Sequence, residues 1–121
     1  MMLEVVAVTR APDGVVVCDR CHVADSIWSR MKGLLGRNSL ASGEGMAIRP
    51  APSIHTFFMR FPIDVVFLSR NGDVLKVSPN VKPWRARLCS RAHAVLELAD
   101  GEAKRHGIAR GQRLMLERKE Q

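Results

Sequence analysis

The chain has 121 residues, of which 46% are hydrophobic and 26% are charged, and its formal net charge is +7. These proportions exclude a disordered chain, and the length is enough to bury a core without help from a disulfide or a metal ion. We therefore expect residues 1–121 to form a single domain. The basic residues are spread along the chain, which favours an ordinary solvated surface over a dedicated patch for nucleic acid or membranes.

The sequence contains none of the signals that direct a protein to or through a membrane. Its first residues lack a basic leader, and no apolar stretch is long enough to span a bilayer. Three cysteines without an export signal are typical of reduced thiols. These observations predict a cytoplasmic protein.

The first elements in the chain predict a β-hairpin and a helix. Val-rich strands at Leu3–Val8 and Val15–Val17, the second continuing toward Val23, flank an Ala-Pro-Asp-Gly turn. Apolar residues at helical spacing then predict a helix over residues 26–35, with Asp25 or Ser26 as its N-cap and its end at Gly36.

The middle of the chain is an apolar run, IHTFFMRFPIDVVFL at residues 54–68, which is preceded by a short strand at Gly45–Arg49 and the proline-rich segment RPAPS. Its second half, Ile63–Leu68, predicts a fully buried strand. The Asn-Gly pair between this run and Val74–Val77 is a strong hairpin signal. Asp64 lies inside the run, so its carboxylate should be paired or hydrogen-bonded.

The last third of the chain predicts two strands and a short helix. Asn80–Arg91 has the composition of a loop or an irregular edge strand, Ala94–Leu98 and Arg113–Glu117 are strands, and a helix over residues 100–106 ends at Gly107. Many short strands at close spacing predict a mainly-β sandwich or jelly-roll-like barrel with these two helices added.

Several segments have an order and spacing found in a known family. They are GLLGR at residues 33–37, GEGM at 43–46, FFMRFPIDVVFL at 57–68, NGDVLKV at 71–77, and LEL at 96–98 followed by Gly101, Gly107 and Gly111. Together they resemble the domain of unknown function 192 family, whose members have no established activity. The resemblance implies a mainly-β sandwich of jelly-roll type with a helix near the N-terminus. The chain departs from the commoner pattern at Phe58, where a Trp is usual, and at His55-Thr56.

A Cys-x-x-Cys-His motif, formed by Cys18, Cys21 and His22, suggests four interpretations. It matches the attachment site of c-type haem, which normally accompanies export. A zinc site would need a fourth ligand, from Cys89 or a distant His. A redox-active thiol pair is the third interpretation. The favoured interpretation is that both cysteines pack in the second strand, with no metal ion and no cofactor.

A second group of candidates is polar and lies in or near apolar segments. The group consists of Arg37, His55, Arg60, Asp64 and Glu97. A buried carboxylate at Asp64 or Glu97 can accept backbone N–H groups or pair with Arg37 or Arg60, and this is the structural interpretation that we favour. The functional interpretation is that His55 and the two carboxylates converge as acid, base or metal ligands.

The third candidate is Trp84, which stands between basic residues in KPWRAR, with Arg85 beside it. Such a segment can stack on bases and contact phosphates, or it can anchor a loop on the core, which is the favoured alternative.

Three functions remain open. The leading hypothesis is a small, non-catalytic protein that binds an unidentified small molecule or protein through the face of His55, Met59, Arg60 and Asp64. The second is a hydrolase or metal-dependent enzyme that uses His55, Asp64 and Glu97. The third is nucleic-acid binding around Trp84.

Overall fold

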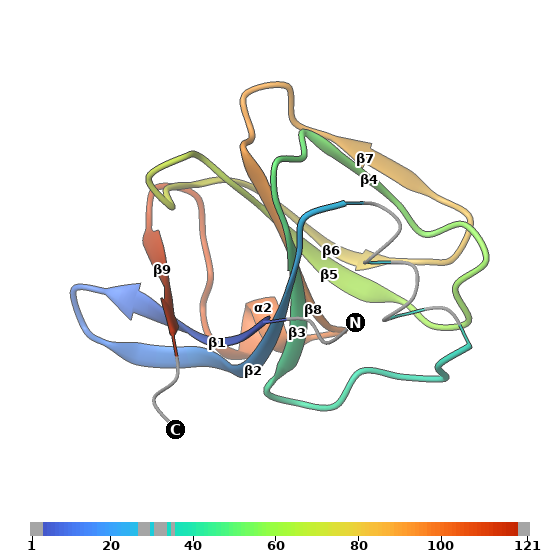
Figure 1. Cartoon of the computed structure of the whole chain (residues 1–121), viewed down its shortest axis with the longest axis horizontal. Helices are drawn as coiled ribbons and strands as arrows, with labels where there is room; N and C mark the ends of the chain where they lie inside the picture. The colour runs from blue at the N-terminus through green and yellow to red at the C-terminus, as the bar shows by residue number, and fades with distance from the viewer. Residues whose placement is uncertain (1–3, 27–29, 31–33, 35, 119–121) are drawn as a thin grey trace.

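The structure, a computed structural model, describes residues 4–26, 30, 34 and 36–118, and it is mainly β (Figure 1). A short helix, α2, lies between the last two strands. The elements in chain order are β1 (Glu4–Ala11), β2 (Val15–Ala24), β3 (Glu44–Ile48), β4 (Ser53–His55), β5 (Ile63–Leu68), β6 (Val74–Val81), β7 (Ala86–Leu88), β8 (Ala94–Ala99), α2 (Glu102–Arg105) and β9 (Arg113–Arg118).

Seven of these strands form one sheet, in the order β6-β5-β8-β3-β2-β1-β9, and β4 and β7 form a separate two-stranded ribbon. Neighbouring strands in the sheet are antiparallel except for β2 and β3, which are parallel. The parallel pair needs a long crossover connection, and residues 25–43 provide it.

The sheet curls until its two outer strands meet. An isolated β-bridge joins Asp73 to Arg113, and the Leu114 N–H donates to the Gly72 carbonyl at 2.9 Å. Gly72 has a φ of 89°, and a Cβ at this position would lie 2.1 Å from the Leu114 carbonyl oxygen. The meeting of β6 and β9 therefore requires glycine in the Asn-Gly turn.

Strands β5 and β8 are buried at every position because the curled sheet has a hydrophobic core on each face. The inner core fills the curl and includes Val8, Cys18, Cys21, Val66, Leu96 and Leu114. The outer core lies between the other face of the sheet and the β4–β7 ribbon, and it includes Met46, Ile54, Met59, Phe61, Val65 and Val95. Side chains alternate between the two cores along β5 and β8, as the two-residue period requires.

The structure confirms the predicted mainly-β class, the first hairpin and the Asn-Gly hairpin. Helix α2 lies within the predicted range 100–106. Most of the helix predicted over 26–35 lies outside the described residues. The proline-rich segment was expected to be a connection only, yet Ser53 pairs with Leu88 and begins β4. Among the described residues, no helix has the length and hydropathy needed to cross a membrane.

Candidate functional site

The site is built around Thr56, a fully buried residue that joins the end of β4 to the loop before β7. Its hydroxyl donates to the Lys82 carbonyl at 2.6 Å and accepts the Arg85 N–H at 2.9 Å. Its backbone N–H donates to the Arg85 carbonyl, and its carbonyl accepts the Trp84 N–H. Thr56 therefore holds the Trp84 loop against the end of β4.

Four rings gather over this junction in an aromatic cluster that consists of His55, Phe57, Phe58 and Trp84. The His55 and Phe57 rings stack with their centroids 4.7 Å apart, and Phe58 meets Trp84 edge-on at 4.7 Å. Phe58 and Trp84 are 62% and 56% exposed. Both have positive φ, 67° and 65°, a conformation that is strained for bulky side chains. The backbone is therefore strained at two residues whose aromatic side chains are exposed to solvent.

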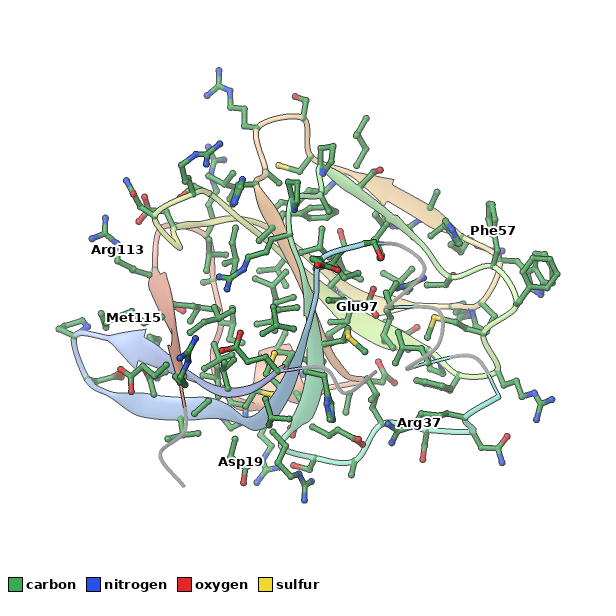
Figure 2. The ribbon with its side chains drawn as sticks, viewed as in Figure 1. Asp19, Arg37, Phe57, Glu97, Arg113 and Met115 are labelled. Carbon is green, nitrogen blue, oxygen red and sulfur yellow. The ribbon has the colours of Figure 1, made fainter. Side chains whose placement is uncertain are left out.

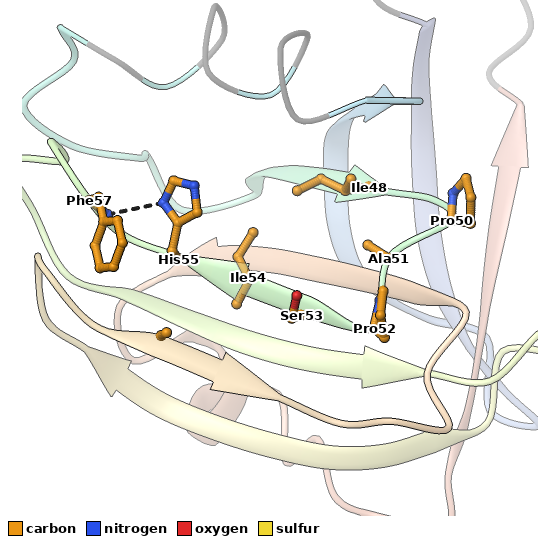
Figure 3. A pocket seen from close by; sticks show the side chains of 9 residues that line it. Ile48, Pro50, Ala51, Pro52, Ser53, Ile54, His55 and Phe57 are labelled. Atoms are coloured by element: carbon orange, nitrogen blue, oxygen red, sulfur yellow. Dashed lines mark hydrogen bonds between the residues drawn. The ribbon is translucent and has the colours of Figure 1, made fainter.

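A groove of about 510 Å³ adjoins the aromatic cluster (Figure 3). Ile48, Ala51 and Ile54 line it together with two prolines, and His55 and Phe57 lie at one end. The Phe57 N–H donates to Nδ1 of His55 at 3.3 Å. Burial and the nearby positive charge of Arg30 lower the pKa of His55, so the ring is neutral at pH 7 and its Nδ1 can accept this bond. The groove is therefore mainly apolar.

A buried ion pair lies beneath the site. The Arg30 Nε donates to Oε1 of Glu97 at 2.7 Å, and the Arg30 Nη2 lies 3.4 Å from the Met59 sulfur. The Arg30 and Glu97 side chains are 2% and 0% exposed. Burial raises the pKa of Glu97, and the Arg30 guanidinium opposes that shift. Within the described part of the chain, Oε2 of Glu97 is buried without a hydrogen-bond partner.

Asp64 has a structural position on the other face of the sheet. Its two carboxylate oxygens accept the N–H groups of Asn80 and Ala103, each at 2.9 Å. Residue 65 is the cross-strand partner of Glu97, so Asp64 and Glu97 project toward opposite cores. The expectation that a buried carboxylate would accept backbone N–H groups is confirmed for Asp64.

The remaining predicted site residues are dispersed. Arg37 forms a bidentate ion pair with Glu44, with hydrogen bonds of 2.7 and 2.6 Å, and this pairing lowers the pKa of Glu44. Arg60 is exposed, and the Arg85 side chain turns back toward its own loop carbonyls. The structure thus places His55 and Trp84 in one aromatic cluster and Met59 and Glu97 against Arg30, but it brings neither Arg37 nor Asp64 to them.

Sequence reasoning missed two parts of the site. The Phe-rich run indicated core, yet Phe57 and Phe58 are exposed because the chain turns at Phe58 before Met59 enters the outer core. Arg30, the partner of Glu97, had no signal beyond its place in the predicted helix. Trp84 does not anchor its loop in the core; Thr56 does. The available signal was the adjacent pair Phe57 and Phe58, because only one of two neighbouring side chains can face a core.

The Cys-x-x-Cys-His motif does not form a ligand cluster. Cys18 and Cys21 lie in the inner core with 1% and 0% exposure, and His22 is half-buried. In the part of the chain that the structure covers, no three His, Cys, Asp or Glu side chains are grouped so that they could hold a metal ion.

This fold and site define a mainly-β protein with an exposed aromatic surface. The sequence profile of the uncharacterised family DUF192 matches residues 8–116, and the chain belongs to this family. It is 38% identical over 80 residues to a UPF0127 protein of Pyrococcus horikoshii, an alignment that covers 63% of this chain and 69% of that protein.

Two solved structures share the fold. A protein of Sinorhizobium meliloti 1021, described as a proposed transcription regulator, matches with a TM-score of 0.83 and 22% identity over 96% of both chains. A protein of unknown function from Novosphingobium aromaticivorans matches with a TM-score of 0.77 and 26% identity, covering 93% of this chain and 84% of that one. The first likeness, at this identity, shows the fold alone.

Proposed function

We propose that the protein is a non-catalytic, cytoplasmic, single-domain binding protein. Its working surface would be the aromatic cluster and the groove beside it, and its partner an extended protein segment with apolar side chains and acidic flanks. The observation that carries the proposal is that the side chains of Phe58 and Trp84 are exposed while their backbone has a strained, positive φ. Aromatic side chains held in place on a surface are typical of binding hot spots.

The surroundings of the aromatic cluster support this choice of partner. The groove is apolar and lies along β4, a strand of the short ribbon, so an extended segment can place a side chain in it. Lys82 and Arg60 lie near the cluster in sequence, and the formal net charge of +7 favours acidic flanks. A cytoplasmic setting is compatible with three cysteines that are all free thiols.

The alternative of an enzyme that uses His55, Asp64 and Glu97 has less support. Asp64 faces the inner core and is occupied by two backbone N–H groups. Glu97 is fully buried and paired with Arg30. General acid–base work needs groups that can reach a common substrate, and this arrangement does not favour one.

Replacing Phe58 and Trp84 by glycine tests the binding surface without a large change in stability. Glycine relieves strain of about 1–2 kcal/mol at each positive φ, which offsets its greater freedom in the unfolded chain, about 0.5–1 kcal/mol. Each lost aromatic anchor should reduce affinity by about 2 kcal/mol, or about thirtyfold in Kd. The measurement uses phage-displayed peptides selected on the wild type, with Kd from fluorescence anisotropy and stability from urea unfolding.

Met115→Gly is the matched control, because Met115 is also exposed, at 45%, but lies far from Phe57 (Figure 2). We expect the selected peptides to bind this variant as tightly as the wild type. Peptides that bind Phe58→Gly and Trp84→Gly with unchanged Kd would reject the proposed surface.

Nucleic acid is the second candidate, because Trp84 lies among basic residues and a structural neighbour is described as a proposed transcription regulator. For a labelled single-stranded oligonucleotide, the logarithm of the binding constant would then fall linearly with the logarithm of the salt concentration. Trp84→Gly would lower the binding constant. We expect no such specific binding, since Arg85 and Arg87 turn to carbonyls of their own loop. A steep salt slope that depends on Trp84 would favour this candidate over the peptide.

A further inference from the structure

Cys18 and Cys21 lie on the same face of β2, although residues three apart in a regular strand face opposite ways. The exception is produced by a β-bulge. Cys21 is opposite Val6 while Cys18 is opposite Val8, so the register shifts between them. The intervening N–H groups, those of residues 19 and 20, both donate to the Gly43 carbonyl, at 3.0 and 2.9 Å. The bulge turns both thiols into the inner core, and bulges that redirect side chains are often functional.

The two thiols share the inner core, and their environments are unequal. Interaction with the Cys21 thiol lowers the pKa of Cys18. The pKa of Cys21 is raised, first by Cys18 and second by burial. The Cys18 thiol also donates to the Gly43 carbonyl at 3.3 Å. Such a pair has one sulfur suited to attack and one suited to follow it.

A polar hollow of about 260 Å³ leads toward Cys18. Its lining includes Cys18, Ser42, Gly43 and Arg105. The Arg105 side chain is 63% exposed, so it places a positive charge at the rim. Cys18 as a whole is only 1% exposed, so reaction requires the turn at Gly43 to move aside. Asp19 also lines the hollow and Arg105 is paired with Glu102, so the rim carries charges of both signs.

We infer that Cys18 and Cys21 form a reversible disulfide by exchange with a low-molecular-weight disulfide of the glutathione type. The Cys18 thiol loses its proton, and its sulfur attacks one sulfur of the reactant. The reactant's S–S bond breaks, and one thiolate leaves and takes up a proton. Cys21 then loses its proton and attacks the Cys18 sulfur, which expels the second thiolate. The protein loses two electrons and two protons, and the reactant gains them as two thiols.

The second step becomes easier once the first has occurred. The largest cause of the high pKa of Cys21 is its interaction with the Cys18 thiol. In the mixed disulfide this thiol no longer exists, so that cause is removed. The polar hollow is lined by Cys18 and not by Cys21, so Cys18 attacks first and Cys21 closes the bond.

The test incubates the native full chain with oxidised glutathione and follows intact mass and peptide maps. Cys89→Ser removes the half-buried third thiol and serves as the background. We expect an internal Cys18–Cys21 disulfide, seen as the loss of two hydrogens, that reduced glutathione reverses. In Cys21→Ser, a glutathione adduct should accumulate on Cys18. In Cys18→Ser, Cys21 should stay unmodified.

Two results would overturn the inference. One is a native Cys89→Ser protein that keeps both thiols at every glutathione ratio. The other is a disulfide that forms only under conditions that unfold the chain, as judged by circular dichroism of the same samples. Because the wild type and Cys89→Ser retain both core cysteines, the test does not depend on the folding of the other two variants.

Discussion

Replacing Glu97 by Leu should lower the free energy of unfolding by about 3–5 kcal/mol, because the change leaves the Arg30 guanidinium buried without its partner. The lost bond is short, 2.7 Å, and the Arg30 side chain is only 2% exposed, so water cannot replace the carboxylate. Urea unfolding followed by circular dichroism measures the loss. A change below about 1 kcal/mol, typical of exposed pairs, would mean that water reaches this pair.

The double variant Arg30→Met/Glu97→Leu separates the cost of an unpaired charge from the worth of the pair. Replacing both partners by apolar side chains is often neutral or stabilising, and Oε2 of Glu97 already lacks a hydrogen bond. We expect the double variant to recover most of the stability lost in Glu97→Leu. A double variant as unstable as the single one would show that the ion pair itself stabilises the outer core.

Replacing Asp64 by Ala should destabilise the other side of the sheet. The Asp64 carboxylate accepts the N–H groups of Asn80, in β6, and Ala103, in α2. Each N–H left unsatisfied costs about 1–3 kcal/mol, and the two losses fall on one site. We expect the free energy of unfolding to drop and the amide hydrogens of Asn80 and Ala103 to exchange faster than those of β8.

Asp64→Asn is the matched control, since it keeps the shape and one acceptor oxygen. Its loss of stability should lie between those of the wild type and Asp64→Ala, with one of the two N–H groups still protected. If both variants were as stable as the wild type, the carboxylate would not be needed to hold α2, and a functional role for Asp64 would regain support.

The sequence indicated the strands well because their signals are local. The Asn-Gly turn and the apolar run at Ile63–Leu68 specify a hairpin and a buried strand within a few residues. The family resemblance indicated the β class. Neither signal gives the long-range pairing of β2 with β3 or the ribbon of β4 and β7, which depend on contacts between distant segments.

The candidate site was harder to predict than the fold. His55, Met59 and Trp84 do come together, but the reason is Thr56, whose bonds to Lys82 and Arg85 span a loop that no local pattern defines. The partners of the buried carboxylates could not be predicted from the sequence either. Periodicity shows that a carboxylate is buried. It does not show whether the carboxylate pairs with a distant side chain such as Arg30 or accepts a backbone N–H.

The closure at Gly72 also protects the molecule from aggregation. Strands at the ends of an open sheet expose unpaired backbone groups that other chains can pair with. Here β6 and β9 share bonds where they meet, and the charged side chains of Lys76 and Arg118 are exposed on the rest of their length. A bulkier residue at Gly72 would separate the two strands, so chains would associate through edges that are now turned toward each other.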